Sequence, residues 1–136
     1  MKTILVLDDD FVLLSLLCSL LQRHGYHTLE AGNTEDALRR FHDNHRQIDL
    51  LIADVTLPLG SGIQAASALR AELPDLPVIL ASGYPSDTWT AGDSALLGRL
   101  GSDLVSILLK PFAPQTLMRT ISELIGAEQT NAARAV

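Results

Sequence analysis

Short apolar runs alternate with longer amphipathic segments along this chain of 136 residues. Five runs have the length and the apolar content of buried strands, and each is followed by a segment long enough to form a helix. This alternation predicts five βα units arranged around a parallel sheet, which is an α/β fold. The predicted strands are residues 2–7, 26–30, 50–53, 78–82 and 106–109.

The ends of the expected helices carry residue types that begin and end helices. Asp10 and Asn33 precede the first and second helices, and their side chains can accept hydrogen bonds from free backbone N–H groups. Pro114 falls in the first turn of the last helix, while Gly25 and Gly126 follow the ends of the first and last helices. These residues agree with the helices that the apolar pattern predicts.

Size and composition predict one domain. A chain that is 47% hydrophobic and 19% charged suits a single sizeable core. The domain is predicted to cover residues 1–126, and residues 127–136, which have no apolar stripe, are predicted to form a flexible tail. The formal charge of −6 argues against a nucleic-acid partner, because no basic stripe is present to contact a phosphate backbone.

The sequence predicts neither export nor membrane insertion. The N-terminal apolar run is interrupted after four residues by three aspartates, which argues against a signal peptide. The apolar stretch 11–21 is too short to cross a bilayer. With Cys18 as its one cysteine, the chain cannot form an internal disulfide. We therefore expect a cytoplasmic protein without a membrane partner.

The first predicted helix is more apolar than contact with one sheet requires. Leucines and Cys18 cover most of its circumference and leave mainly Ser15, Ser19 and Gln22 as polar residues. Two interpretations remain open at this point. The helix is either buried on most of its sides or carries an exposed apolar surface on which a partner docks.

Three of the apolar runs end on ionisable residues. Asp8, Asp9 and Asp10 follow the first run. Asp54 follows the third, and Lys110 follows the fifth. Because ligands bind outside the carboxyl ends of the strands in an open parallel sheet, these groups are expected to converge. Carboxylates bind hard cations such as Mg²⁺, and a carboxylate beside a cation and a lysine can accept a phosphoryl group.

Four motifs in the order ILVLDDD, LLIADVTLPLGSG, VILASG and LLKPF resemble the receiver (CheY-like) domains of two-component response regulators. The resemblance covers nearly the whole chain. It implies a flavodoxin-like (βα)5 three-layer sandwich with strand order 2-1-3-4-5. It also implies a phosphorylation-activated signalling switch, not an enzyme, whose partner is a sensor histidine kinase or a histidine phosphotransfer protein. SGYP after the fourth strand is similar to receivers of hybrid sensor kinases, and a homodimer is also compatible with the sequence.

Carried over by position, the resemblance assigns metal ligands. Asp54 would be the phosphoacceptor. Asp9 and Asp54 would hold Mg²⁺, or Mn²⁺, through their carboxylates. Asp8 would act mainly through a bound water, and Thr56 would contribute its backbone carbonyl.

The resemblance also assigns the groups that bind the phosphoryl oxygens. Ser82 would donate its hydroxyl, supported by the backbone amide of Gly83, and this new bond would pull the following loop inward. Lys110 would bind another phosphoryl oxygen. Its bond to Pro111 is similar to the cis peptide of the family.

Several positions depart from the family pattern or leave its kinetics open. Ile107 replaces the Tyr or Phe that usually rotates on activation. The segment 84–104 is long and contains three glycines, which predicts a short, displaced or mobile fourth helix, with Trp89 as a packing anchor. Thr56 and Tyr84 occupy the positions that tune dephosphorylation, and neither carries a carboxylate or an amide. This predicts a long-lived phosphoaspartate that Tyr84 shields.

Two other interpretations compete with the switch. A haloacid dehalogenase-type phosphatase would use Asp8, Asp10, Ser82 and Lys110. That class needs an acidic pair on a strand after the lysine, whereas Glu123 and Glu128 lie outside any predicted strand. The third class is a receiver-like scaffold that signals by protein contacts and never takes phosphate.

Overall fold

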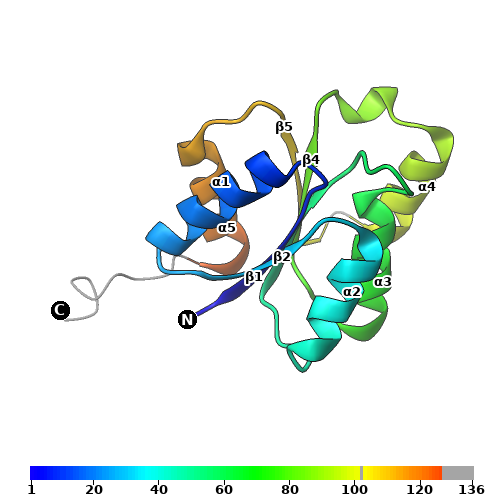
Figure 1. The fold of residues 1–136 in the computed structure, drawn as a ribbon. Coiled ribbons are helices and arrows are strands. Elements are labelled where there is room, and N and C mark those ends of the chain that lie inside the picture. The colour runs from blue at the N-terminus through cyan, green and yellow to red at the C-terminus, as the bar shows by residue number, and fades with distance from the viewer. Residues whose placement is uncertain (102, 127–136) are drawn as a thin grey trace.

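The computed structural model describes residues 1–101 and 103–126 and contains a five-stranded parallel sheet between two layers of helices (Figure 1). The strands pair in the order β2-β1-β3-β4-β5, which confirms the predicted flavodoxin-like order. Their bounds are β1 Thr3–Leu7, β2 His27–Ala31, β3 Leu50–Asp54, β4 Val78–Ser82 and β5 Val105–Leu109. Each bound lies within one residue of its predicted position. The predicted tail, residues 127–136, lies outside the described residues.

Five helices and a short 3-10 turn connect the strands. α1 and α5 cover one face of the sheet, while α2, α3 and α4 cover the other (Figure 1). Among the described residues, no helix is both long enough and apolar enough to cross a membrane. The bounds are α1 Phe11–Arg23, α2 Thr34–Asp43, α3 Gly62–Glu72, η1 Ser86–Thr88, α4 Ala91–Leu100 and α5 Pro114–Ile125.

The predicted caps are present. The Asp10 side chain accepts hydrogen bonds from the backbone N–H groups of the second and third residues of α1, and Asn33 caps α2 in a similar way. Pro114 is the first residue of α5. Gly25 and Gly126 have φ angles of 92° and 78°, a left-handed conformation that glycine adopts without steric cost.

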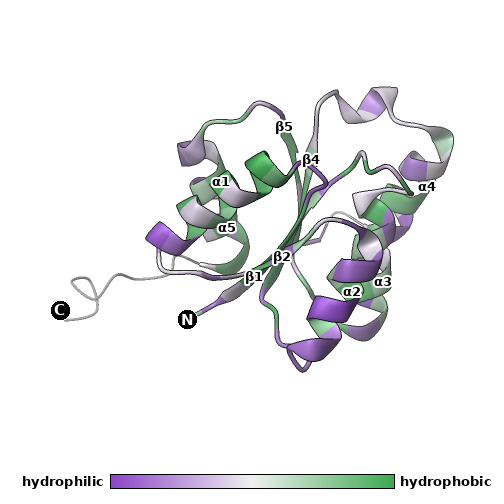
Figure 2. Ribbon diagram, viewed as in Figure 1, coloured by the Kyte–Doolittle hydropathy of each residue, from purple (hydrophilic) through white to green (hydrophobic). Residues whose placement is uncertain are grey.

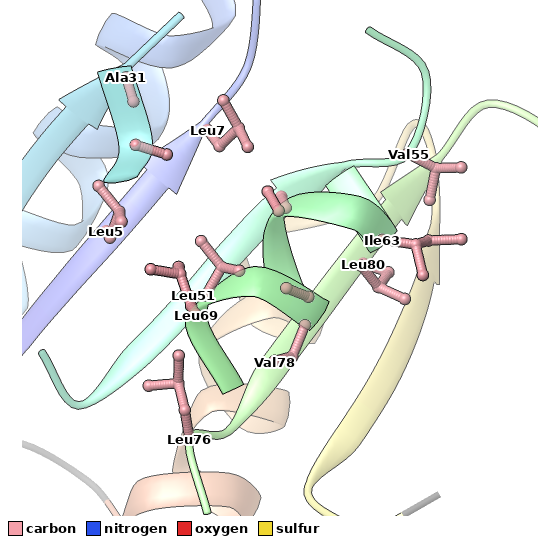
Figure 3. Packing of buried hydrophobic residues seen from close by; sticks show 14 of the residues in the cluster. Leu5, Leu7, Ala31, Leu51, Val55, Ile63, Leu69, Leu76, Val78 and Leu80 are labelled. Atoms are coloured by element: carbon pink, nitrogen blue, oxygen red, sulfur yellow. The ribbon is translucent and has the colours of Figure 1, made fainter. Parts of the chain in front are cut away.

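Alternate residues of the central strands enter two separate cores. Ile4 and Val6 of β1 pack in the layer of α1 and α5, while Leu5 and Leu7 pack in the layer of α2, α3 and α4. Figure 2 shows apolar residues concentrated along the strands and polar residues on the outer sides of the helices. Figure 3 shows the second of these cores between the sheet and α3. Because both faces of the sheet are covered, its central strands are apolar throughout.

The structure answers the question that the first helix left open, because α1 has one buried and one exposed apolar face. The exposed face begins at the end of the helix nearest Asp10. The buried side chains are Leu14, Leu17, Cys18 and Leu21. The exposed ones are Phe11, Val12 and Leu16, at 75%, 71% and 63% of their full accessible area.

The long connection after β4 is ordered into η1 and α4. α4 has ten residues but no fully buried side chain, so it packs more loosely on the sheet than α3 does. Trp89, between η1 and α4, is 7% exposed and belongs to the core of the α2, α3 and α4 layer. The prediction that Trp89 is a packing anchor is therefore confirmed.

Candidate functional site

The acidic residues predicted from strand ends meet at the carboxyl edge of the sheet. Asp8 and Asp9 follow β1, and Asp54 ends β3. One carboxylate oxygen of each lies within 4.8 Å of the others. They converge because β1 and β3 are adjacent parallel strands whose last pair is Leu7 and Ala53, so both strands end at the same level. Asp8 is buried, whereas Asp9 is exposed.

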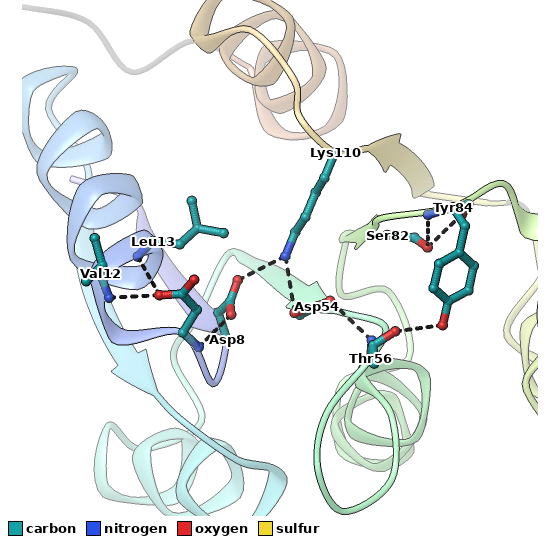
Figure 4. A network of polar contacts seen from close by, with 9 residues as sticks. Asp8, Val12, Leu13, Asp54, Thr56, Ser82, Tyr84 and Lys110 are labelled. Atoms are coloured by element: carbon teal, nitrogen blue, oxygen red, sulfur yellow. Dashed lines mark hydrogen bonds and ion pairs between the residues drawn. The ribbon is translucent and has the colours of Figure 1, made fainter.

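Lys110 approaches these acids from the end of β5 (Figure 4). Its ammonium nitrogen lies 3.1 Å from Oδ2 of Asp54 and 3.3 Å from Oδ2 of Asp8. β4 separates β3 from β5 in the sheet, so the side chain spans one intervening strand. The Lys110–Pro111 peptide bond is cis.

Each of the two carboxylates in contact with Lys110 is also bound by backbone. Oδ1 of Asp54 accepts a hydrogen bond from the N–H of Thr56 at 3.1 Å, and Oδ1 of Asp8 accepts one from the N–H of Asp10 at 2.9 Å. The two Oδ2 atoms therefore face the lysine while the Oδ1 atoms hold the carboxylates in orientation (Figure 4).

The site has more negative charge than its lysine balances. Burial raises the pKa of Asp54, and this effect outweighs the opposing attraction of Lys110. Burial alone would lower the pKa of Lys110, but Asp8 and Asp54 raise it above its ordinary value. The lysine therefore stays charged at neutral pH, and a divalent cation among the three carboxylates would offset the remaining repulsion.

Ser82 lies at the end of β4, and its hydroxyl is bound to the loop that follows. Oγ donates a hydrogen bond to the carbonyl of Tyr84 at 2.7 Å, and accepts from the N–H of Tyr84 and from the indole Nε1 of Trp89, both at 3.2 Å. The Tyr84 phenol also lies 2.8 Å from the hydroxyl of Thr56 (Figure 4). Gly83, between Ser82 and Tyr84, is exposed. The loops after β3 and β4 are thus linked beside the carboxylates.

The contact between Trp89 and Ser82 was not foreseen from the sequence. The apolar pattern places the ring of Trp89 in the core. No spacing rule predicts a hydrogen bond between side chains seven residues apart across an irregular loop. Ile107, the other atypical position, lies on β5 opposite Leu80 of β4 and is 40% exposed.

Gly62 packs against the backbone of Asp54. It begins α3, and a Cβ atom at this position would lie 2.2 Å from the backbone oxygen of Asp54 and 2.9 Å from Cβ of Ala53. Its N–H donates to the carbonyl of Val55 at 3.2 Å. The absence of a side chain at Gly62 therefore lets α3 pack directly against the backbone that carries Asp54.

Comparison with known proteins agrees with this geometry. The sequence profile of the response regulator receiver domain matches residues 4–122. The chain belongs to the response regulator receiver domain family. It is 36% identical over 125 residues to the transcriptional regulatory protein CpxR of Escherichia coli (strain K12), an alignment that covers 92% of this chain and 50% of CpxR. This receiver domain therefore spans about half the length of the curated relatives that it matches.

Solved structures of receiver domains superimpose closely on this one. A response regulator receiver domain protein from Clostridium thermocellum has a TM-score of 0.77 and 30% identity, with 92% of this chain and 94% of that chain covered. The response regulator protein TrrA from Thermotoga maritima, in complex with Mg²⁺-BeF, has a TM-score of 0.73 and 31% identity. That comparison covers 91% of this chain and 99% of TrrA.

Membership of the family confirms the predicted fold and the predicted function. A receiver domain is a phosphoacceptor signalling module and not a classical enzyme. It is phosphorylated by histidine kinases on an aspartate with Mg²⁺, and the cluster of Asp8, Asp9 and Asp54 is typical of a Mg²⁺ site.

The structure does not favour the phosphatase interpretation. Among the described residues, β5 is the last strand, so no later strand carries an acidic pair, and Glu123 lies on α5. Glu128 lies outside the described residues. The carboxylate of Asp10 caps α1. Asp54, which that interpretation leaves without a role, is instead in direct contact with Lys110.

Proposed function

We propose that Asp54 is the phosphoacceptor of this receiver domain. The observation that carries the proposal is the position of its carboxylate: Oδ2 lies 3.1 Å from the Lys110 ammonium, and one of its oxygens lies within 4.8 Å of oxygens from Asp8 and Asp9. In the transfer, Oδ2 attacks the phosphorus of a phosphohistidine, the P–N bond breaks, and the imidazole leaves as an O–P bond forms. Later attack by water on the phosphorus breaks this O–P bond, releases inorganic phosphate and regenerates the carboxylate.

Mg²⁺ or Mn²⁺ would be held by the carboxylates of Asp9 and Asp54 and by the backbone carbonyl of Thr56. When bound, the ion neutralises charge on the phosphoryl oxygens. By analogy with the family, Asp8 would act on the ion mainly through a bound water, while its Oδ2 faces Lys110. An all-oxygen donor set of this kind suits a hard cation.

Ser82, Gly83 and Lys110 would bind the oxygens of the phosphoryl group. Lys110 already contacts Asp54, so it needs little movement. The Ser82 hydroxyl has to exchange its bond to Tyr84 for one to the phosphoryl group, and the loop after β4 changes with it. Ile107 is not aromatic, so the signal does not depend on rotation of a ring at that position.

Thr56 and Tyr84 would set a long lifetime for the phosphoaspartate. Their hydroxyls are bound to each other at 2.8 Å, beside the N–H that holds Asp54. Neither side chain is a base or an amide able to orient an attacking water. The closed pair also limits the access of water to the phosphoryl group.

A sensor histidine kinase or a histidine phosphotransfer protein would dock in the groove beside α1 that the exposed Leu16 helps to line. A groove of about 370 Å³ runs between α1 and the start of α5, and Lys110 forms part of its wall. A helical partner seated there would present its phosphohistidine next to Asp54. SGYP after β4 supports a phosphorelay of the hybrid sensor kinase type. The apolar lining is Leu13, Leu16, Leu17, Leu20, Pro111, Phe112 and Pro114.

The proposal is tested with acetyl phosphate and Mg²⁺, using intact mass and Asp54→Asn as the control. We expect one phosphoryl group on the wild type and none on the variant. Label that survives in Asp54→Asn but disappears with Asp8→Asn would contradict the assignment of the phosphoacceptor. A wild-type protein that takes no label with Mg²⁺ present would support the scaffold instead.

A further inference from the structure

The indole of Trp89 has a polar contact that packing alone does not require. Its Nε1 lies 3.2 Å from Oγ of Ser82 and 3.3 Å from the carbonyl oxygen of Tyr84. One N–H is therefore shared between two acceptors. Both contacts are buried or partly buried, and the side chain is 7% exposed.

The Ser82 hydroxyl is fully committed in this arrangement. A serine hydroxyl has one hydrogen to donate and two lone pairs that accept. Its hydrogen goes to the Tyr84 carbonyl, and its lone pairs receive the N–H of Tyr84 and the indole N–H of Trp89. Donation to a phosphoryl oxygen on Asp54 therefore requires Ser82 to release the Tyr84 carbonyl.

We propose that Trp89 is a positioning residue for Ser82, whose indole N–H takes over the Tyr84 carbonyl when the hydroxyl turns to the phosphoryl group. The inference rests on the proposed phosphorylation of Asp54. Before the exchange, the carbonyl accepts from Ser82 and shares the N–H of Trp89. After it, the same carbonyl accepts the whole of that N–H.

This exchange leaves both the Tyr84 carbonyl and the Trp89 indole N–H with a hydrogen-bond partner. A partly buried carbonyl left without a donor carries a desolvation penalty, and so does a buried indole N–H. Because the indole already lies within hydrogen-bond distance of both acceptors, a small rotation is enough to move it from a shared bond to a single one. Trp89 therefore favours the state in which Ser82 has turned.

Trp89 also connects this exchange to α4. Its ring belongs to the core against which three partly buried leucines of that helix pack: Leu96, Leu97 and Leu100. α4 has no fully buried side chain of its own, so a rotated indole meets little resistance from it. Because this chain has Ile107 at the usual aromatic position, the Trp89 ring could carry a conformational change from the Ser82 hydroxyl to α4 at the surface.

The test uses the full chain with Mg²⁺ and BeF₃⁻ as the phosphoryl mimic. Trp89 is the only tryptophan, so intrinsic fluorescence reports its environment directly. We expect BeF₃⁻ to shift the emission of the wild type. At saturating BeF₃⁻ the shift is expected to vanish in Ser82→Ala, whereas Asp54→Asn binds no BeF₃⁻ at all.

Affinity for BeF₃⁻ is measured independently by ¹⁹F NMR in a double-mutant cycle. Trp89→Phe keeps a ring but removes the N–H, and should weaken BeF₃⁻ binding about tenfold while leaving Mg²⁺ affinity unchanged. In the Ser82→Ala background the same substitution should have no further effect. Circular dichroism checks that each variant is folded, and the fluorescence comparison with Ser82→Ala does not depend on Trp89→Phe folding.

Three results would overturn the inference. They are additive effects of the two substitutions, unchanged or tighter BeF₃⁻ binding by Trp89→Phe, and an emission shift that persists in Ser82→Ala. A wild type that binds no BeF₃⁻ with Mg²⁺ present would instead overturn the phosphorylation of Asp54, and the inference with it.

Discussion

Replacing Gly62 with alanine tests how α3 supports the phosphoacceptor. The added Cβ atom would lie 2.2 Å from the backbone oxygen of Asp54 and 2.9 Å from Cβ of Ala53. Neither neighbour can rotate away, because one is backbone and the other is fixed to the central strand β3. To accept the methyl group, the start of α3 and the end of β3 must separate by most of an ångström.

The sign of the effect follows from two opposing contributions. Alanine is favoured over glycine inside a helix by about 1 kcal/mol at most. Overpacking in a close-packed region costs about 1–3 kcal/mol and sometimes more, and a contact this short against backbone belongs at the upper end. We therefore expect a net loss of about 2 kcal/mol in the free energy of unfolding. Displacement of Asp54 should also slow phosphorylation by about tenfold or more.

Urea unfolding and the rate of labelling by acetyl phosphate measure the two effects. Gly98 in α4 provides the matched control, because a Cβ there would meet no atom within 4 Å. Gly98→Ala should stabilise the protein by about 0.5–1 kcal/mol and leave labelling unchanged. If Gly62→Ala were as stable as the wild type, the close packing of α3 on Asp54 would be refuted.

Four further predictions each concern one residue. Arg70 donates hydrogen bonds to the carbonyls of Leu76, Leu100 and Asp103. Arg70→Met should therefore lower the free energy of unfolding, measured in urea, by about 2 kcal/mol. An unchanged urea midpoint would mean that water replaces the guanidinium. Burial raises the pKa of Cys18 from 9.0 to about 11, so a thiol reagent at pH 8 should label only unfolded protein. Because the folded state holds this proton more tightly, stability should fall as pH rises above 9.0, a loss that Cys18→Ala removes. The pKa of Asp54 is raised in the folded state, so its ionised form lowers stability at pH values above the pKa of the unfolded state. Asp54→Asn should therefore melt at a higher temperature than the wild type in metal-free neutral buffer, and this difference should disappear in acid. Equal melting temperatures at neutral pH would contradict the prediction. Tyr84→Phe removes the hydrogen bond to Thr56 but keeps the ring. A phosphate-release time course should then show a phosphoaspartate lifetime shortened by about fivefold. An unaltered lifetime would show that Thr56 and Tyr84 do not shield the phosphoaspartate.

The sheet could be predicted from the sequence because its central strands are buried on both faces. β1, β3 and β4 read as continuous apolar runs that end on charged or turn residues, so their bounds were predicted closely. The order of the strands does not follow from periodicity. It followed from the resemblance to a family, since the same five βα units can be wound in other orders.

The two faces of α1 show where composition is not enough. A leucine that packs on the sheet and a leucine that faces solvent for a partner have the same chemistry, so a helix covered by them has no single predicted orientation. Leu17 is buried and Leu16 is exposed although they are neighbours in the sequence. In the folded chain Leu17 belongs to the core that includes residues of β1 and α5, and Leu16 does not.

The convergence of Asp8, Asp54 and Lys110 was predictable because it depends on strand ends, which periodicity locates well. The partners of Ser82 were not, because they depend on backbone dihedrals in an irregular loop and on a hydrogen bond that is directional over a few tenths of an ångström. Ile107 and Trp89 illustrate the difference. The first could be recognised in the sequence as lacking an aromatic ring, while the second supplies a ring near the same hydroxyl by a route that no spacing rule describes. The residues proposed for phosphorylation thus lie at strand ends, whereas the contacts proposed to carry the signal lie in the loop after β4, which periodicity does not describe.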